Sequence, residues 1–138
     1  MAAKWATTAL ALRLVLSDTG PSQFRTPEGA VVADLDRGRT ARLANRAQRR
    51  ALAIRDRHCA FPGCDRRAAW TDAHHVIWWR RQGHTDMKNL ALLCRFHHRA
   101  VHAGRYDLTM AAAQAPVFTH VTTGERVIPR RQRPPPPS

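Results

Sequence analysis

Cysteine and histidine residues that can bind metal ions are concentrated in one stretch of this sequence. In chain order they are Cys59, Cys64, His74, His75, Cys94, His97, His98 and His102. A structural zinc ion takes four such ligands, usually as two short-spaced pairs separated by a longer stretch. This part of the chain therefore holds more ligands than one zinc ion can use.

A first group of these residues has the spacing of a structural zinc site. Cys59 and Cys64 are separated by four residues, and Cys94 and His97 by two. The group uses every cysteine of the chain. Three buried free cysteines are an alternative, and a disulfide between Cys59 and Cys64 would leave Cys94 over. The paired spacing favours zinc.

The histidines outside this group form two pairs, with Asn89 between them. They are His74, His75, His98 and His102. Three imidazoles with open coordination positions are typical of a catalytic metal site, whereas four closed ligands are typical of a structural one. We therefore expect two metal sites in this stretch.

A helix is predicted over residues 94–105, CRFHHRAVHAGR, because an apolar strand-like stretch precedes it and Gly104 is a favourable helix end. His98 and His102 are four residues apart, so on a helix their rings lie on the same face and can share an ion. His97 points about 100° away from His98. The helix is expected to carry zinc on one face and a second ion on another.

The segment around the first histidine pair, WTDAHHVIWW, is predicted to be a strand because it is rich in β-branched and aromatic residues. Adjacent side chains of a regular strand point to opposite sides. His74 and His75 can therefore serve one site only if the strand bulges or ends nearby.

The order of these residues resembles the HNH endonuclease motif. The resemblance is carried by DAHHV, NLALLC and FHHRAVH, and upstream by GRTARLANRAQRRALAIRDRHCAFPGC. The chain resembles more closely the bacterial HNH proteins that usually carry a large N-terminal domain of unknown function. The similar part runs from about residue 34 to residue 108, and the stretch before it does not match, so the chain looks like a short form of these proteins.

The resemblance implies an α+β fold and a role for each residue of both groups. The fold would be a small ββα-metal unit with a structural zinc, preceded by a basic helix and followed by a short β-hairpin. His75 would be the general base, and Asn89 would hold the loop and the base-bearing strand in register. The catalytic divalent ion would be bound by His74, His98 and His102, and the structural Zn²⁺ by Cys59, Cys64, Cys94 and His97.

These residue types suit hydrolysis of the phosphodiester bonds of DNA by a metal-dependent endonuclease. A neutral imidazole with a pKa of about 6.5 can accept a proton from water. A bound divalent ion can stabilise the phosphate and the leaving oxygen. Nitrogen ligands suit Zn²⁺, Ni²⁺ or Mn²⁺ more than Mg²⁺, and the identity of the ion stays open. The alternative is a zinc-stabilised DNA-binding module without turnover, or an inactive nuclease remnant.

The charge of the chain indicates the same partner. The formal net charge is +13, from 23 lysines and arginines against 10 acidic residues. Such a surface attracts polyanions, so DNA contacted mainly through its phosphates is the expected partner. At 138 residues the chain is one small domain, and domains of this size often depend on a metal for stability.

Part of this charge follows a helical pattern, which predicts a basic amphipathic helix over residues 34–57. Its apolar side would include Leu43, Ala47, Ala51 and Ile54. A solvated helix face is the alternative, but next to a nuclease site we expect phosphate contacts. The arginines expected to make them are Arg39, Arg42, Arg46, Arg49 and Arg50, together with Arg80 and Arg81 near the strand.

The two ends of the chain give weaker signals. Residues 1–33 are expected to form a helix, through Trp5, Ala9, Leu12 and Leu16, followed by a loop. Arg13 interrupts the apolar run, which is too short to span a bilayer, so we expect neither a signal peptide nor a membrane span.

Three further expectations concern the cell compartment and the C-terminal part. The few cysteines, all assigned to zinc, suit the cytoplasm. A β-hairpin is expected over residues 109–129, with its turn at Thr123–Gly124, and a disordered Arg/Pro tail over 130–138. His84 and His120 are expected to be exposed residues without a metal role.

Overall fold

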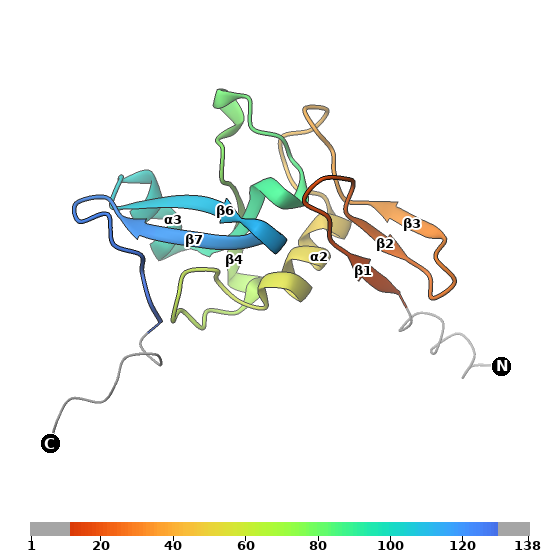
Figure 1. The fold of residues 1–138 in the computed structure, drawn as a ribbon, viewed down its shortest axis with the longest axis horizontal. Coiled ribbons are helices and arrows are strands. Elements are labelled where there is room, and N and C mark those ends of the chain that lie inside the picture. The colour runs from red at the N-terminus through yellow and green to blue at the C-terminus, as the bar shows by residue number, and fades with distance from the viewer. Residues whose placement is uncertain (1–11, 130–138) are drawn as a thin grey trace, which may run out of the picture.

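The computed structural model describes residues 12–129 (Figure 1). The predicted tail over residues 130–138, and Trp5 and Ala9 of the predicted N-terminal helix, lie outside the described residues. The helices and strands follow in the order β1 (Arg13–Val15), β2 (Gln23–Arg25), β3 (Val31–Asp34), α2 (Arg46–Asp56), β4 (Thr71–His75), β5 (Leu90–Cys94), α3 (Arg95–His102), β6 (Tyr106–Ala111) and β7 (Ala115–His120). Short 3-10 helices lie between them: η1 (Ala68–Trp70), η2 (Trp79–Arg81), η3 (Met87–Asn89) and η4 (Ala112–Gln114).

The centre of the molecule is a ββα unit, as the sequence predicted. Strand β4 pairs antiparallel with β5, with His74 opposite Ala91 and His75 opposite Leu90. Helix α3 follows β5 directly and ends just before Gly104, whose φ of +76° suits glycine. All five residues of β5 are buried, because α2 and α3 both pack against this strand. The apolar run LALL is therefore a strand covered on both faces.

Helix α2 is shorter than the predicted helix over residues 34–57 and begins at Arg46. Asn45 caps the N-terminus of the helix through a capping box. The Asn45 side chain accepts a hydrogen bond from the Gln48 N–H, and the Gln48 side chain accepts one from the Asn45 N–H. Before this cap, Asp36 accepts backbone hydrogen bonds from Ser22 and Met87. These bonds hold the preceding segment as a loop.

The buried face of α2 fixes the elements that carry the candidate site. Ala51 and Leu52 are completely buried against β5 and β2. The Gln48 side chain donates hydrogen bonds to the backbone carbonyls of Leu35 and Thr85, at 2.7 and 2.8 Å. Arg55 donates to the carbonyl groups of Met87 and Leu90, at the start of β5. The helix thereby holds the loop before β5 as well as the strand itself.

The N-terminal part is a three-stranded antiparallel sheet in the order β1-β2-β3 (Figure 1), so the predicted helix through Leu12 and Leu16 is wrong. Leu14 and Leu16 pack against the core, whereas Arg13 is exposed. This alternation with a period of two is that of a strand, and the apolar run was too short to tell the two periods apart.

The C-terminal hairpin joins β6 to β7 and begins earlier than the predicted boundary at residue 109. Its turn is η4, where Ala113 and Gln114 have positive φ angles of 60° and 51°. Residues 112–114 include no glycine or asparagine that would indicate a turn. A second turn does lie near the predicted Thr123–Gly124, and after it Arg126 pairs with Thr119. The chain thus forms a short meander.

Two apolar clusters form the core. One joins the N-terminal sheet to α2 and β5, and includes Phe24, Leu52 and Leu92. The other joins β5, α3 and the β6–β7 hairpin, and includes Leu93, Val101 and Phe118. Over residues 12–129, neither helix has the length and apolar character needed to cross a bilayer.

Candidate metal centres and nuclease site

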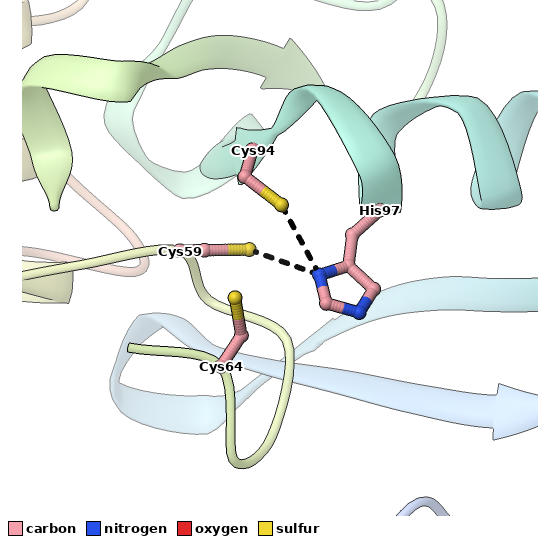
Figure 2. A group of neighbouring side chains, drawn as sticks. All are labelled: Cys59, Cys64, Cys94 and His97. Carbon is pink, nitrogen blue, oxygen red and sulfur yellow. Dashed lines mark hydrogen bonds between the residues drawn. The ribbon is translucent and has the colours of Figure 1, made fainter. Parts of the chain in front are cut away.

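The four residues of the first group converge from three segments (Figure 2). Their ligand atoms all lie within 4.8 Å of one another. His97 Nδ1 is 3.3 Å from Cys94 Sγ and 3.6 Å from Cys59 Sγ. A tetrahedral zinc ion with ordinary bond lengths would place nitrogen and sulfur ligands about 3.5 Å apart. We call this group, Cys59, Cys64, Cys94 and His97, the zinc quartet.

Burial of the quartet also fits a metal ion. Cys59 is completely buried and Cys94 is 2% exposed, and no cysteine of the described residues forms a disulfide. Burial raises the pKa of the Cys59 thiol to about 12, although hydrogen bonds from the backbone at Cys94 and Phe61 lower it. A zinc ion binds the thiolate form and so would reverse this preference.

Aromatic packing links the quartet to the second core cluster. The Phe61 ring stacks on His97 with centroids 3.9 Å apart and an interplanar angle of 8°. Tyr106 and Phe118 of the hairpin contact Phe61 edge-on. A metal ion in the quartet would therefore fasten the loop at residues 59–64 to α3 and the hairpin.

The three histidines assigned to the catalytic ion also converge. His74 comes from β4, and His98 and His102 come from α3, with the His98 and His102 Nε2 atoms 3.1 Å apart. Their ligand atoms lie within 4.8 Å of one another. We call His74, His98 and His102 the histidine triad. The pairing of His98 with His102 on one helix face follows the sequence prediction.

His74 provides a test of whether the triad suits a metal ion. Its side chain is 4% exposed, and its Nε2 atom has no hydrogen-bond partner among the described residues. Burial, together with the positive charges that His98, His102 and His75 can carry, lowers the pKa of His74 to about 3. A buried nitrogen that is neutral and unpaired is costly unless something binds it. A divalent cation between the three rings meets that need.

His75 is the last residue of β4, so the strand ends where the sequence argument required it. Its Nε2 atom lies 2.9 Å from the Thr85 hydroxyl oxygen, and that hydroxyl donates its hydrogen to the Arg42 carbonyl at 3.1 Å. The single hydroxyl hydrogen is thus used, so His75 Nε2 must be the donor to Thr85. The Nδ1 atom then keeps its lone pair.

The surroundings of His75 keep its ring uncharged. Burial lowers the pKa of His75 below 6.5, and the positive charges of Arg42 and Arg39 lower it further. A neutral imidazole with a free Nδ1 lone pair can accept a proton. The geometry therefore leaves one histidine of the four outside the triad and suited to act as a base.

Asn89 closes the loop between β4 and β5. Its side-chain amide donates to the carbonyl groups of Ile77 and His84 at 3.0 and 2.9 Å, and its oxygen accepts the Ile77 N–H at 2.8 Å. The Asn89 carbonyl accepts the Val76 N–H. The bonds to Val76 and Ile77 hold the backbone directly after His75, and the bond to His84 holds the far end of the loop.

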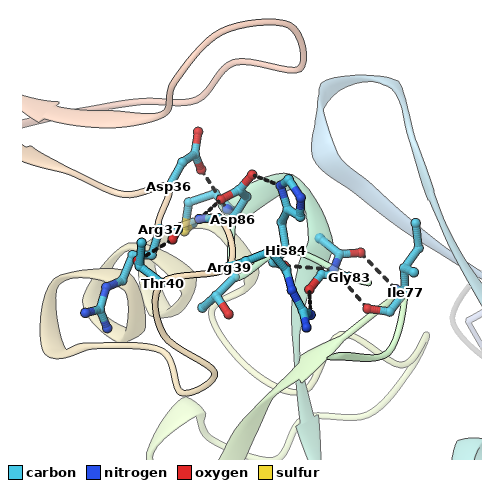
Figure 3. A network of polar contacts seen from close by, with 12 residues as sticks. Asp36, Arg37, Arg39, Thr40, Ile77, Gly83, His84 and Asp86 are labelled. Atoms are coloured by element: carbon cyan, nitrogen blue, oxygen red, sulfur yellow. Dashed lines mark hydrogen bonds and ion pairs between the residues drawn. The ribbon is translucent and has the colours of Figure 1, made fainter. Parts of the chain in front are cut away.

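A second set of polar contacts, which the sequence did not indicate, holds Thr85. Its neighbours His84 and Asp86 lie within the polar network of Figure 3. The Thr85 N–H donates to the Gly38 carbonyl, and the Arg37 N–H donates to the Thr85 carbonyl. Asp86 accepts the Gly38 N–H at 2.8 Å, and its other oxygen lies 3.4 Å from the His84 ring. His84 is exposed, as predicted, and the network around it fixes the hydroxyl that contacts His75.

Position 83 in the same loop requires glycine, because there is no room for a side chain. A Cβ atom there would lie 1.7 Å from the Ile77 carbonyl oxygen. The loop backbone can therefore approach the end of β4 only with glycine at this position.

The arginines predicted to contact phosphate divide into two kinds. Arg39 stacks 3.6 Å above the Trp79 ring and donates to the carbonyls of Trp79 and Gly83, and Arg49 donates to the Thr71 carbonyl. These two side chains serve the fold. The other five, Arg42, Arg46, Arg50, Arg80 and Arg81, are exposed and are available to a ligand. Arg39 and Arg42 precede α2 and are therefore not part of a helix face.

An open cleft of about 650 Å³ gives access to the triad and to His75. Arg42, Arg80, Trp78 and Trp79 line it together with all four histidines. Burial and the neighbouring His102 lower the pKa of His98. Asp72, which also lines the cleft, raises the same pKa and so opposes part of this effect. The cleft therefore presents nitrogen ligands, a neutral base and guanidinium groups to one open space.

Residues 58–104 match the family model described as HNH endonuclease. This part of the chain is an HNH domain. Its span includes the zinc quartet, the triad, His75 and Asn89. HNH domains suggest nuclease-type activity and bind metal.

Part of the chain is similar to mycobacterial proteins that are named as uncharacterized. One protein of Mycobacterium bovis and one of Mycobacterium tuberculosis are each 43% identical to the chain over 65 residues. Another from Mycobacterium tuberculosis is 38% identical over 65 residues. The match covers 47% of this chain and 14% of each relative. No solved structure matches the chain.

Proposed function

We propose that the protein is a metal-dependent HNH endonuclease that hydrolyses phosphodiester bonds of DNA. The observation that carries this proposal is the unpaired, buried Nε2 atom of His74, in a triad whose ligand atoms lie within 4.8 Å of one another. The separate His75, whose pKa is lowered, lies beside it. A fold that only needed stability would gain nothing from a buried polar atom without a partner. A metal site that acts on a substrate explains it.

In the proposed reaction, His75 accepts a proton from a water molecule at Nδ1. The water oxygen forms a bond to phosphorus, and the bond from phosphorus to the leaving oxygen breaks. Thr85 holds the Nε2–H of His75, so Nδ1 stays the accepting atom. Asn89 keeps the backbone after His75 in place, so the base stays at the end of β4.

The triad would hold one divalent ion, with ligands from His74, His98 and His102. When bound, this ion would neutralise the charge that develops on the phosphate and the leaving oxygen. Zn²⁺, Ni²⁺ and Mn²⁺ suit three imidazoles, and Mg²⁺ is the weaker candidate because it prefers oxygen ligands. The quartet would hold a structural Zn²⁺, because four protein ligands complete a tetrahedral site and leave no position for a substrate.

DNA would approach over the cleft and be contacted through its phosphates. Arg42 and Arg80 line the cleft, and Arg46, Arg50 and Arg81 are exposed without an ion pair in the described part of the chain. Guanidinium contacts to phosphate do not depend on sequence, so binding should weaken steeply with salt and be largely sequence-independent. We also propose a cytoplasmic location, because free cysteines suit a reducing compartment.

A plasmid-nicking assay tests the proposal. Purified protein with added Mn²⁺, Ni²⁺ or Mg²⁺ should convert supercoiled plasmid to the nicked form, and His75→Ala should lower the rate by about 100-fold or more. The zinc content and the circular dichroism spectrum of His75→Ala should match those of the wild type. Equal nicking by both proteins would show contamination and contradict the proposal. DNA binding without any nicking would favour the non-catalytic module instead.

A further inference from the structure

A second surface hollow, of about 470 Å³, lies beside α3 and includes no residue of the quartet or the triad. Arg95, Phe96 and Arg99 come from the helix itself. Arg66 comes from the segment after Cys64, and Arg105 follows the end of α3. All five of these side chains are exposed. We call this group the arginine hollow.

The arginines of this hollow differ from those that serve the fold. Arg39, Arg49 and Arg55 donate hydrogen bonds to backbone carbonyl groups. Within residues 12–129, no guanidinium group of the hollow forms a hydrogen bond or an ion pair with the protein. Four positive charges therefore face one hollow with all their donors available. Four such arginines together favour binding of a ligand that carries several negative charges.

Phe96 adds a property that charge alone does not explain. Its side chain is 65% exposed, and its ring meets His97 edge-on, with centroids 5.1 Å apart and an interplanar angle of 89°. An exposed aromatic face among arginines is the combination with which proteins bind single-stranded nucleic acid, by stacking bases and pairing phosphates. A duplex keeps its bases stacked on one another and would gain from the arginines but not from the ring.

The position of the hollow on α3 connects it to the triad. With about 100° of rotation per residue, Arg95 and Arg99 form the stripe of α3 next to the stripe of His98 and His102. Phe96 follows further round the same side. A strand that passes the triad can therefore continue around the helix into the hollow without crossing the buried face of α3.

We propose that the arginine hollow binds a single-stranded stretch of nucleic acid next to the cutting site. Its phosphates would lie on Arg66, Arg95, Arg99 and Arg105, and one base would stack on Phe96. This interaction surface rests on the proposed nuclease function for its biological meaning. Binding itself requires no cleavage, so the two can be tested separately.

The test is the binding of a fluorescent oligothymidine to the full chain, measured by anisotropy without added divalent metal. Phe96→Ala should weaken binding by about tenfold, and Phe96→Trp should keep it, because stacking and not size is what matters. The double variant Arg95→Gln/Arg99→Gln should lower the slope of log affinity against log salt by about 1.4, since two phosphate contacts are lost.

A matched control removes the same charge elsewhere. Arg13 and Arg126 are exposed, lie outside the hollow and line none of the clefts described above. Arg13→Gln/Arg126→Gln should change the affinity much less than Arg95→Gln/Arg99→Gln. Equal losses for the two double variants would show that only net charge matters and would overturn the proposal. So would unchanged binding by Phe96→Ala, or competition by polyglutamate as strong as that by unlabelled oligothymidine.

Failure of the nuclease proposal gives a different pattern. Suppose that the wild type nicks no plasmid but that the oligothymidine results are as expected. The hollow is then supported as a single-strand binding surface, and the proposed nuclease function is contradicted. If the wild type nicks plasmid and Phe96→Ala binds oligothymidine like the wild type, the hollow is overturned and the nuclease stands.

Discussion

The zinc quartet and the histidine triad share α3 but differ in closure. The quartet has four ligands, of which Cys59 and Cys94 are buried, and aromatic rings pack over it. The triad has three ligands, and His102 is exposed at an open cleft. Closed ligands can only hold structure together, whereas an open set can admit a substrate. The proposed function would therefore place stability on one face of the helix and chemistry on the other, and variants of either site can test this division.

Loss of a quartet ligand should have the largest effect. We expect Cys94→Ala to unfold the domain, because a structural zinc ion contributes about 10 kcal/mol or more to folding in small modules, and small domains are stable by a similar amount. Circular dichroism and thermal melting measure this. Melting at the wild-type temperature would show that the quartet is not structural.

A chelator should separate the two sites in one protein. We expect brief treatment with a moderate chelator to remove the ion of the triad, which lines the open cleft, and to abolish nicking. The helical circular dichroism signal should stay unchanged. Added Mn²⁺ should then restore the activity, since the buried quartet exchanges its ion slowly. Simultaneous loss of structure and nicking would contradict the assignment of two independent sites.

Loss of a triad ligand should remove activity and leave the fold. His98→Ala should lower the nicking rate by more than about 100-fold, because even the groups that orient metal ligands contribute 10 to 100-fold. The change in the free energy of unfolding should stay within about 1 kcal/mol, since His98 is only partly buried. Unfolding of His98→Ala would show that the triad is needed for stability and would contradict its assignment as the catalytic site.

The smallest effect is expected at Thr85, which acts through His75. Thr85→Val keeps the shape but removes the hydroxyl, so we expect kcat to fall by about 10 to 100-fold with KM nearly unchanged. Thr85→Ser should keep most of the activity because it retains the hydroxyl. An equal loss in both variants would show that the residue matters only for packing.

Spacing predicted which cysteines and histidines lie together, because it reflects local geometry. A helix fixes which side His97, His98 and His102 face. The residues predicted the strand and the helix, and the resemblance to the HNH motif predicted the ββα unit. Residues that act through tertiary contacts were not predicted. The backbone of Thr85 is held beside His75 by hydrogen bonds to Arg37, Gly38 and Gln48, which are far away in the sequence.

Two predictions about helices differed from the structure, for reasons that lie in their local sequence. The start of α2 could have been found, since Asn45 and Gln48 are three residues apart as a capping box requires. The predicted helix at Leu12 and Leu16 failed because a short apolar run fits two periodicities. Pairing with β2 makes this segment a strand, and the residues of the segment itself do not predict that pairing.

The most direct measurement of the central claim compares two neighbouring residues in protein loaded with Co²⁺. Thiolate bound to Co²⁺ gives a charge-transfer absorption, which reports the quartet and not the triad. We predict that His97→Ala alters this band and that His98→Ala leaves it intact while nicking is lost. A band that His98→Ala changes and His97→Ala does not would contradict the assignment of these adjacent histidines to different metals.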